Sequence, residues 1–165
     1  MYPIYFLPLH PFSIAINTDA RRQADVRYPL VHAMASTKTS QRYQASCHCQ
    51  LVRYTVTLSP PLHDPESWVV ECNCSICARN GYLNVYVQND CIQFESINLD
   101  SDLVEKYRFG KQRVQHYFCS RCGSSLMAES IEPGFYEGVK ALNVRMFQGV
   151  DVRTLQRREV DGKSL

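Results

Sequence analysis

The sequence predicts a single, mainly β domain, and three observations support this fold class. Short segments rich in β-branched and aromatic residues recur along the chain at the length of strands. Gly, Pro, Asn and Asp separate these segments, and no stretch carries a long helical period of apolar residues. The chain has 165 residues, of which 45% are hydrophobic and 21% charged, and this composition suits one globular domain with an apolar core.

The strands are expected in order between residues 43 and 150. In the segment 51–58, apolar side chains alternate at Val52, Tyr54, Val56 and Leu58, and two prolines end the strand. Further strands are expected at Trp68–Glu71, Tyr82–Val87, Ile92–Ile97, Val104–Phe109, Val114–Phe118, Leu126–Glu129 and Ala141–Val144. Residues 1–42 are predicted to be a disordered N-terminal extension, residues 43–150 the domain, and residues 151–165 a polar, frayed C-terminal tail.

The first 16 residues are apolar but contain three prolines, and no basic residue precedes the apolar run. This is unlike a secretion signal, and the run is too short and too interrupted to span a bilayer. We therefore predict a cytoplasmic protein, with organelle targeting by the N-terminal segment as the alternative. An ordinary protein start at Met34 further suggests that residues 1–33 lie outside the working domain.

The charge distribution argues against a nucleic-acid partner. The formal net charge is +2, yet the segment 42–138 carries eight basic and eleven acidic side chains. A nucleic-acid-binding module normally concentrates Lys and Arg on its folded surface. We therefore expect neither a nucleic acid nor a membrane as the partner.

Seven of the eight cysteines fall into three groups with the spacing of metal ligands. The groups are Cys47-His48-Cys49, Cys72-Asn73-Cys74-Ser75-Ile76-Cys77 and Cys119-Ser120-Arg121-Cys122. Cysteines separated by one or two residues in a turn can supply two sulfurs to one zinc ion, whereas disulfides would require an oxidising compartment. The sequence therefore predicts zinc, while the isolated Cys91 is expected to pack as a small apolar residue.

Seven ligands do not divide into two sets of four. A structural zinc site is closed by four protein ligands, whereas a catalytic zinc keeps three and an open position. The count favours a closed site from the first and third groups and an open site from Cys72, Cys74 and Cys77, without proving this partition. A fourth ligand from His or Asp remains the alternative, although His48 is a poor candidate because it stands between two ligands. His116 is expected to pack in a strand or to face solvent.

These motifs resemble those of a known family. They are similar to the motifs of the glutathione-dependent formaldehyde-activating enzyme family, whose domain also occurs in centromere protein V. The similar segments are Ser46-Cys47-His48-Cys49 followed by Val52-Arg53-Tyr54, the six residues Cys72–Cys77 with their three cysteines, and Phe118-Cys119 followed by Cys122-Gly123. The resemblance covers about residues 43–150. It implies the β-tent architecture, in which small antiparallel sheets are held by zinc.

The resemblance also implies roles for the cysteines. It implies two zinc ions per chain: a structural one held by Cys47, Cys49, Cys119 and Cys122, and a catalytic one held by Cys72, Cys74 and Cys77. It further implies a carbon-sulfur lyase that joins formaldehyde to glutathione as S-hydroxymethylglutathione, or reverses that step. Gln50 stands where the family usually has a small residue, often glycine, and the segment 78–81 follows the family only loosely, which leaves the choice of substrate open.

Two functions are therefore compared. A zinc with three thiolates carries net charge −1 and is electron-rich, which suits binding of a thiol better than activation of water. This favours an enzyme acting on thiol adducts of small aldehydes, with Asn73, Arg79 and Tyr82 as candidate helpers near the open site. The alternative is a non-catalytic zinc module that binds a macromolecule, as in centromere protein V, for which a long basic arm would be expected.

Overall fold

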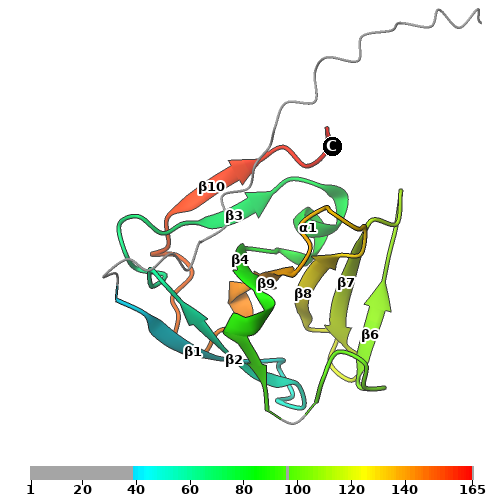
Figure 1. The fold of residues 1–165 in the computed structure, drawn as a ribbon, viewed down its shortest axis with the longest axis horizontal. Helices are drawn as coiled ribbons and strands as arrows, with labels where there is room; N and C mark the ends of the chain where they lie inside the picture. Colours follow the sequence, from blue (N-terminus) through cyan, green and yellow to red (C-terminus); the bar gives the residue numbers. More distant parts are fainter. Residues whose placement is uncertain (1–38, 96, 165) are drawn as a thin grey trace, which may run out of the picture.

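The computed structural model describes residues 39–95 and 97–164, and within them ten strands form two sheets (Figure 1). The smaller, antiparallel sheet has the order β1-β2-β5, with β1 at Gln41–Ser46, β2 at Arg53–Leu58 and β5 at Ile92–Phe94. The larger sheet has the order β10-β3-β4-β9-β8-β7-β6. Its strands are β10 (Arg157–Val160), β3 (Val69–Cys72), β4 (Asn84–Gln88), β9 (Val139–Asn143), β8 (Ser125–Ser130), β7 (Val114–Cys119) and β6 (Val104–Tyr107).

One apolar core joins the two sheets, which confirms the predicted single, mainly β domain. The apolar residues that alternate along β2, together with Val52 just before it, are at most 2% exposed, as a strand with one buried face predicts. The residues in β2 are Tyr54, Val56 and Leu58. They belong to the same buried cluster as Leu126 and Met127 of β8 and Leu142 of β9. The bridge between Ala45 and Phe147 adds a backbone link between the end of β1 and the segment after β9.

Every predicted strand is present, with ends shifted by a few residues. The sequence did not predict β1, which begins just before the expected domain start, or β10, which lies in the expected tail. The prediction of a frayed tail is wrong for the described residues, because β10 pairs with β3 over four residues. This pair is parallel, whereas the other strand pairs of the described chain are antiparallel. The predicted extension lies, up to residue 38, outside the described residues.

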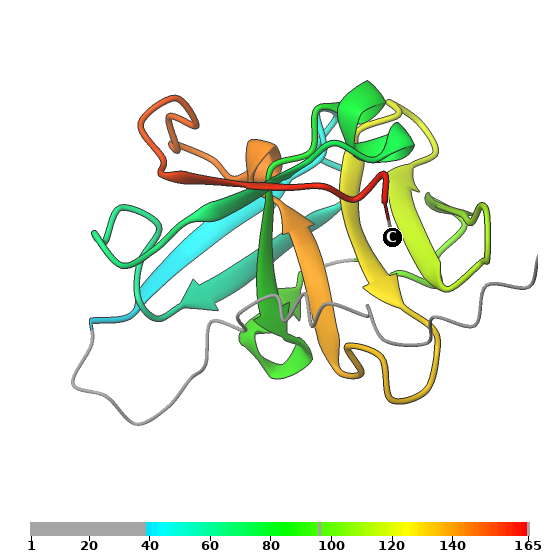
Figure 2. The same cartoon turned by 90° about the horizontal axis from the view of Figure 1, so that it is seen from above.

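One short α-helix, α1 at Ser75–Asn80, connects β3 to β4. It ends at Gly81, whose φ of 60° is the left-handed conformation that a glycine C-cap supplies. Two 3-10 turns, η1 at Asn89–Cys91 and η2 at Val144–Met146, follow β4 and β9. Among the described helices none has the length and apolar character needed to cross a bilayer. Figure 2 shows β10 lying along β3, with the chain beyond it turning toward the region of α1.

Two candidate metal centres and an adjoining cavity

The fold brings the first and third cysteine groups together. Cys47 and Cys49 follow β1 in the smaller sheet, whereas Cys119 ends β7 in the larger sheet and Cys122 lies in the turn to β8. All four Sγ atoms lie within 4.8 Å of one another. This four-cysteine cluster therefore connects the two sheets at positions 70 or more residues apart in the chain.

Two tight turns present these sulfurs. In the first, the Cys47 N–H donates to the Val52 carbonyl at 3.0 Å and the Val52 N–H donates to Cys47 Sγ at 3.4 Å. Gln50 in this turn has a φ of 62°, a conformation that a glycine would adopt at lower cost. In the second turn, Gly123 has a φ of 71° and its N–H donates to the Cys119 carbonyl. A glycine after Cys122 adopts this left-handed conformation without the steric cost of a side chain.

The distances between sulfurs fit a metal better than disulfides. Cys47 Sγ lies 3.5 Å from Cys49 Sγ, which lies 3.7 Å from Cys119 Sγ. A disulfide would require about 2.0 Å between the two sulfurs. Zinc–sulfur bonds of about 2.3 Å at tetrahedral angles place neighbouring sulfurs about 3.8 Å apart. The four thiols therefore match the donor set and the spacing of a closed zinc site.

Cys72, Cys74 and Cys77 form a second group, the three-cysteine cluster. Cys72 ends β3, Cys74 is the N-cap residue of α1, and Cys77 lies buried in that helix. Their Sγ atoms lie within 4.8 Å of one another. Among the described residues, no His, Asp or Glu joins this group, so the alternative of a fourth protein ligand finds no support there. Cys91 belongs to neither cluster.

The proton affinities within the three-cysteine cluster are unequal. The pKa of Cys72 is lowered to about 5, first by the hydrogen bond from the Cys77 thiol and further by backbone N–H groups, against the effect of burial. The pKa of Cys77 is raised, first by that same hydrogen bond with Cys72 and then by burial. Cys72 is therefore the sulfur that carries negative charge at neutral pH before any metal enters.

The four-cysteine cluster shows a similar division. Burial raises the pKa of Cys47 to about 12 and also raises the pKa of Cys119. Burial would likewise raise the pKa of Cys122, but hydrogen bonds from the Ser124 hydroxyl and from the N–H groups of Cys49 and Ser124 lower it to about 5. The thiolate form is thus most favoured at Cys122, whose sulfur accepts several hydrogen bonds.

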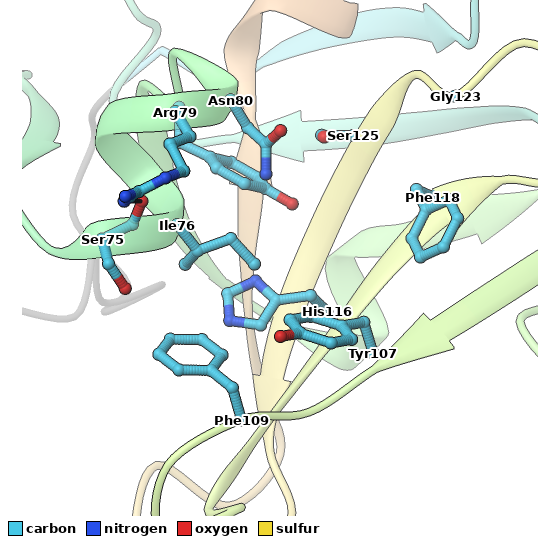
Figure 3. Close-up of a pocket in the computed structure, with 11 residues that line it drawn as sticks. Ser75, Ile76, Arg79, Asn80, Tyr107, Phe109, His116, Phe118, Gly123 and Ser125 are labelled. Carbon is cyan, nitrogen blue, oxygen red and sulfur yellow. Dashed lines mark hydrogen bonds between the residues drawn. The ribbon is translucent and has the colours of Figure 1, made fainter. Parts of the chain in front are cut away.

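A cavity of about 660 Å³ lies between α1 and strands β6, β7 and β8 (Figure 3). Its walls come from α1, from the two aromatic rings at the end of β6, from β7, and from the turn that carries Cys122. The lining residues are Ser75, Ile76, Arg79, Asn80, Tyr82, Tyr107, Phe109, His116, Phe118, Gly123 and Ser125. The cysteines themselves do not line it, but Ser75 and Ile76 lie between Cys74 and Cys77 in the chain. The cavity wall therefore contains chain neighbours of the three-cysteine cluster, and Gly123 is the chain neighbour of Cys122.

His116 packs in its strand, as expected, and it also lines this cavity. The residue is 7% exposed, and its buried Nδ1 atom has no hydrogen-bond partner within the part of the chain that the structure describes. Its ring centroid lies 6.0 Å from that of Tyr82 and 5.7 Å from that of Phe109. Figure 3 shows the imidazole between Ile76 and Phe109. A buried polar atom without a partner indicates a place where a bound molecule can supply the missing hydrogen bond.

Burial keeps this imidazole neutral, because it lowers the pKa of His116 to about 4. The folded protein then binds fewer protons than the unfolded chain between pH 6.5 and 4, so its stability is complete above pH 6.5 and falls as the pH drops toward 4. We expect the free energy of unfolding to fall by about 2 kcal/mol more in the wild type than in His116→Gln between pH 7 and 4.5.

Urea denaturation across this pH range measures the effect. The exposed His63 supplies the control, because His63→Gln leaves the buried imidazole in place and should keep the wild-type slope. Any acid loss of metal is common to the three proteins and cancels in the comparison. Identical slopes for wild type and His116→Gln would contradict a depressed pKa at His116.

Of the three residues predicted to assist at the open site, Arg79 and Tyr82 lie at the cavity and Asn73 does not. Arg79 and Tyr82 line the cavity, and the Arg79 guanidinium donates to the Ser75 carbonyl at 2.7 Å. Asn73 instead bonds to residues after β10. Sequence reasoning missed Tyr107, Phe109 and Phe118, because an aromatic residue in a strand usually signals core packing. Unusual exposure distinguishes Tyr107 and Phe109, at 51% and 38%, and no sequence pattern reveals it.

Comparison with known proteins identifies the family. The model of the family described as glutathione-dependent formaldehyde-activating enzyme matches residues 42–149. The chain belongs to this family. The glutathione-dependent formaldehyde-activating enzyme family is named for an enzymatic activity. Both cysteine clusters of this chain lie within the matched residues.

A solved structure shares the fold. The crystal structure of a Rhodobacter sphaeroides protein is similar over 70% of this chain and 99% of that chain, with 21% sequence identity and a TM-score of 0.55. At this identity the likeness concerns the fold alone. The matched family segment ends at residue 149, before β10 begins.

Proposed function

We propose that this protein is a zinc-dependent carbon-sulfur lyase-type enzyme that acts on thiol adducts of small aldehydes, such as the formaldehyde adduct of glutathione. The observation that carries the proposal is a cluster of three thiols that no fourth ligand joins among the described residues, with Ser75 and Ile76 of the same segment lining a cavity large enough for a small molecule. Membership of the glutathione-dependent formaldehyde-activating enzyme family supports the same chemistry.

We assign two zinc ions per chain in this proposal. The structural ion is held by Cys47, Cys49, Cys119 and Cys122, whose sulfurs join the two sheets. The catalytic ion is held by Cys72, Cys74 and Cys77 and leaves one coordination position for substrate. When bound there, zinc would supply a Lewis acid that favours the thiolate form of a substrate thiol. The three protein thiolates make a soft, electron-rich site that matches a sulfur ligand.

The reaction requires a few simple changes in the adduct. In the breakdown direction, the hydroxyl of an S-hydroxymethyl thiol gives its proton to water, a carbon–oxygen double bond forms, and the carbon–sulfur bond breaks with its electrons going to sulfur, so that the products are formaldehyde, a thiolate and a hydrated proton. The neutral imidazole of His116 can accept a hydrogen bond from a polar group in the cavity, because its pKa keeps it unprotonated. Arg79, at the cavity wall, offers positive charge to an anionic substrate such as glutathione.

The aromatic side chains would hold the apolar part of the adduct and exclude water from it. Tyr107 and Phe109 stack with their rings at 14° and are the exposed aromatic residues of the cavity wall. Tyr82 is buried, which raises its pKa to about 12, so its phenol remains a hydrogen-bond donor at neutral pH. These residues bind and orient the substrate, while the cysteines hold the metal.

Metal content and turnover test the proposal together. Protein purified without chelator is expected to contain two zinc ions per chain by elemental analysis and to break down S-hydroxymethylglutathione faster than buffer alone. In the cobalt-substituted protein, an added thiol is expected to shift the metal's visible absorption. Two bound metal ions with no turnover and no spectral response to any thiol would instead favour the non-catalytic module, and fewer than two would contradict the zinc assignment.

A further inference from the structure

The strand β10 lies beside the first ligand of the three-cysteine cluster, although about 85 residues separate them in the chain. The parallel pairing with β3 places Val160 opposite Cys72, in a register that starts with Arg157 opposite Val69. Arg157 also bonds to Glu71 at 3.1 Å. The residues that follow β10 therefore leave the sheet beside the end of β3, as Figures 1 and 2 show.

Asn73, which stands between two of the cysteines, is held from this side by three hydrogen bonds. Its backbone N–H donates to the Val160 carbonyl at 3.1 Å, and its Nδ2 donates to Asp161 Oδ1 at 2.7 Å. The Lys163 N–H donates to Asn73 Oδ1 at 3.0 Å. The nitrogen and the oxygen of the Asn73 side-chain amide thus both bond to residues 161–163. These bonds hold the backbone that joins Cys72 to Cys74.

Gly162 packs directly against the cluster. A Cβ atom at this position would lie 2.4 Å from Cys72 Sγ and 3.1 Å from the Cβ of Cys74. Real Cβ atoms do not come as close to another atom as 2.4 Å, so any larger residue would have to displace the sulfur or the segment. The backbone of Gly162 is not in the left-handed region, so glycine is needed here for space and not for its φ.

We propose that residues 160–163 form a clasp that holds Cys72 and Cys74 in metal-binding positions, with Gly162 as a positioning residue. The clasp would form one wall of the three-cysteine site, so that ligands reach the metal from another side. This inference rests on the proposed zinc assignment, but it goes beyond the residues that the family model matches, which end at 149. A strand that merely extended the sheet would require neither the bonds to Asn73 nor a glycine against the sulfur.

The variants Gly162→Ala, Asp161→Ala and Lys163→Ala test the clasp in the full chain. Gly162→Ala pushes a methyl group against Cys72, and Asp161→Ala removes the acceptor of the Asn73 amide without adding an atom. Lys163→Ala is the matched control, since it keeps the backbone N–H that bonds to Asn73. Each protein is produced with cobalt in place of zinc, so that it is never free of metal, and its sulfur-to-cobalt absorption is followed during competition with a chelator.

We expect Gly162→Ala to bind its first cobalt as the wild type does and its second at least about ten-fold more weakly, with altered absorption from the second ion. Asp161→Ala should change in the same direction by a smaller factor, and Lys163→Ala should match the wild type. If Gly162→Ala does not fold, Asp161→Ala decides the question. Wild-type affinity and spectrum at the second site in the folded variants would overturn the clasp, whereas a wild type that binds only one cobalt would overturn the zinc assignment itself.

Discussion

Cys119→Ser is expected to unfold or aggregate the protein. Cys119 is fully buried at the end of β7, and its sulfur lies 3.7 Å from that of Cys49 in the other sheet. A structural zinc site contributes about 10 kcal/mol of binding free energy, which is comparable with the whole stability of a domain, about 5–15 kcal/mol. Removing one ligand leaves three thiols that must hold the two sheets together without a closed site, and a hydroxyl buried in place of a sulfur adds to the cost.

Soluble yield, zinc content and thermal melting measure this effect. Cys91→Ser is the matched control, because Cys91 is half-buried, packs against the core and belongs to neither cluster. It should retain both metal ions and lose at most about 1 kcal/mol of stability. A Cys119→Ser protein that melts near the wild-type temperature would show that the four-cysteine cluster does not hold the sheets together.

Cys74→Ser is expected to abolish turnover while the fold survives. Cys74 is the N-cap residue of α1, and its cluster spans only the six residues from Cys72 to Cys77. Loss of this metal therefore relaxes one turn and the short helix, whereas the core between the sheets and the four-cysteine cluster remain intact. The stability should fall by about 1–2 kcal/mol, and breakdown of an S-hydroxymethyl thiol should return to the uncatalysed rate.

The comparison of the two variants is decisive for the division of roles. Cys74→Ser should contain one zinc ion per chain and melt cooperatively close to the wild type, while Cys119→Ser should not. Cys91→Ser again provides the reference for a cysteine-to-serine change outside the clusters. Equal loss of structure in Cys74→Ser and Cys119→Ser, or full activity in Cys74→Ser, would contradict the proposed catalytic role of the three-cysteine cluster.

Local pattern predicted most of the fold. The alternation at Val52, Tyr54, Val56 and Leu58 identifies β2 because a strand with one buried face requires that period. The strand β1, at Gln41–Ser46, was missed because only Tyr43 and Ala45 are fully buried in a largely polar segment. The strand β10 was missed for the same reason: its residues are polar and mostly exposed, so its pairing with β3 leaves almost no apolar signal.

The sequence by itself determined that seven cysteines fall into three groups with the spacing of metal ligands, and it favoured, without proving it, the partition into four and three that the structure shows. The family followed from the same motifs. Only the tertiary structure decided what surrounds those clusters: the cavity that gathers His116, Phe109 and Arg79 from separate elements, and the approach of Gly162 to Cys72. These contacts join residues far apart in the chain, and long-range packing follows from how the sheets close on one core, which no local period encodes.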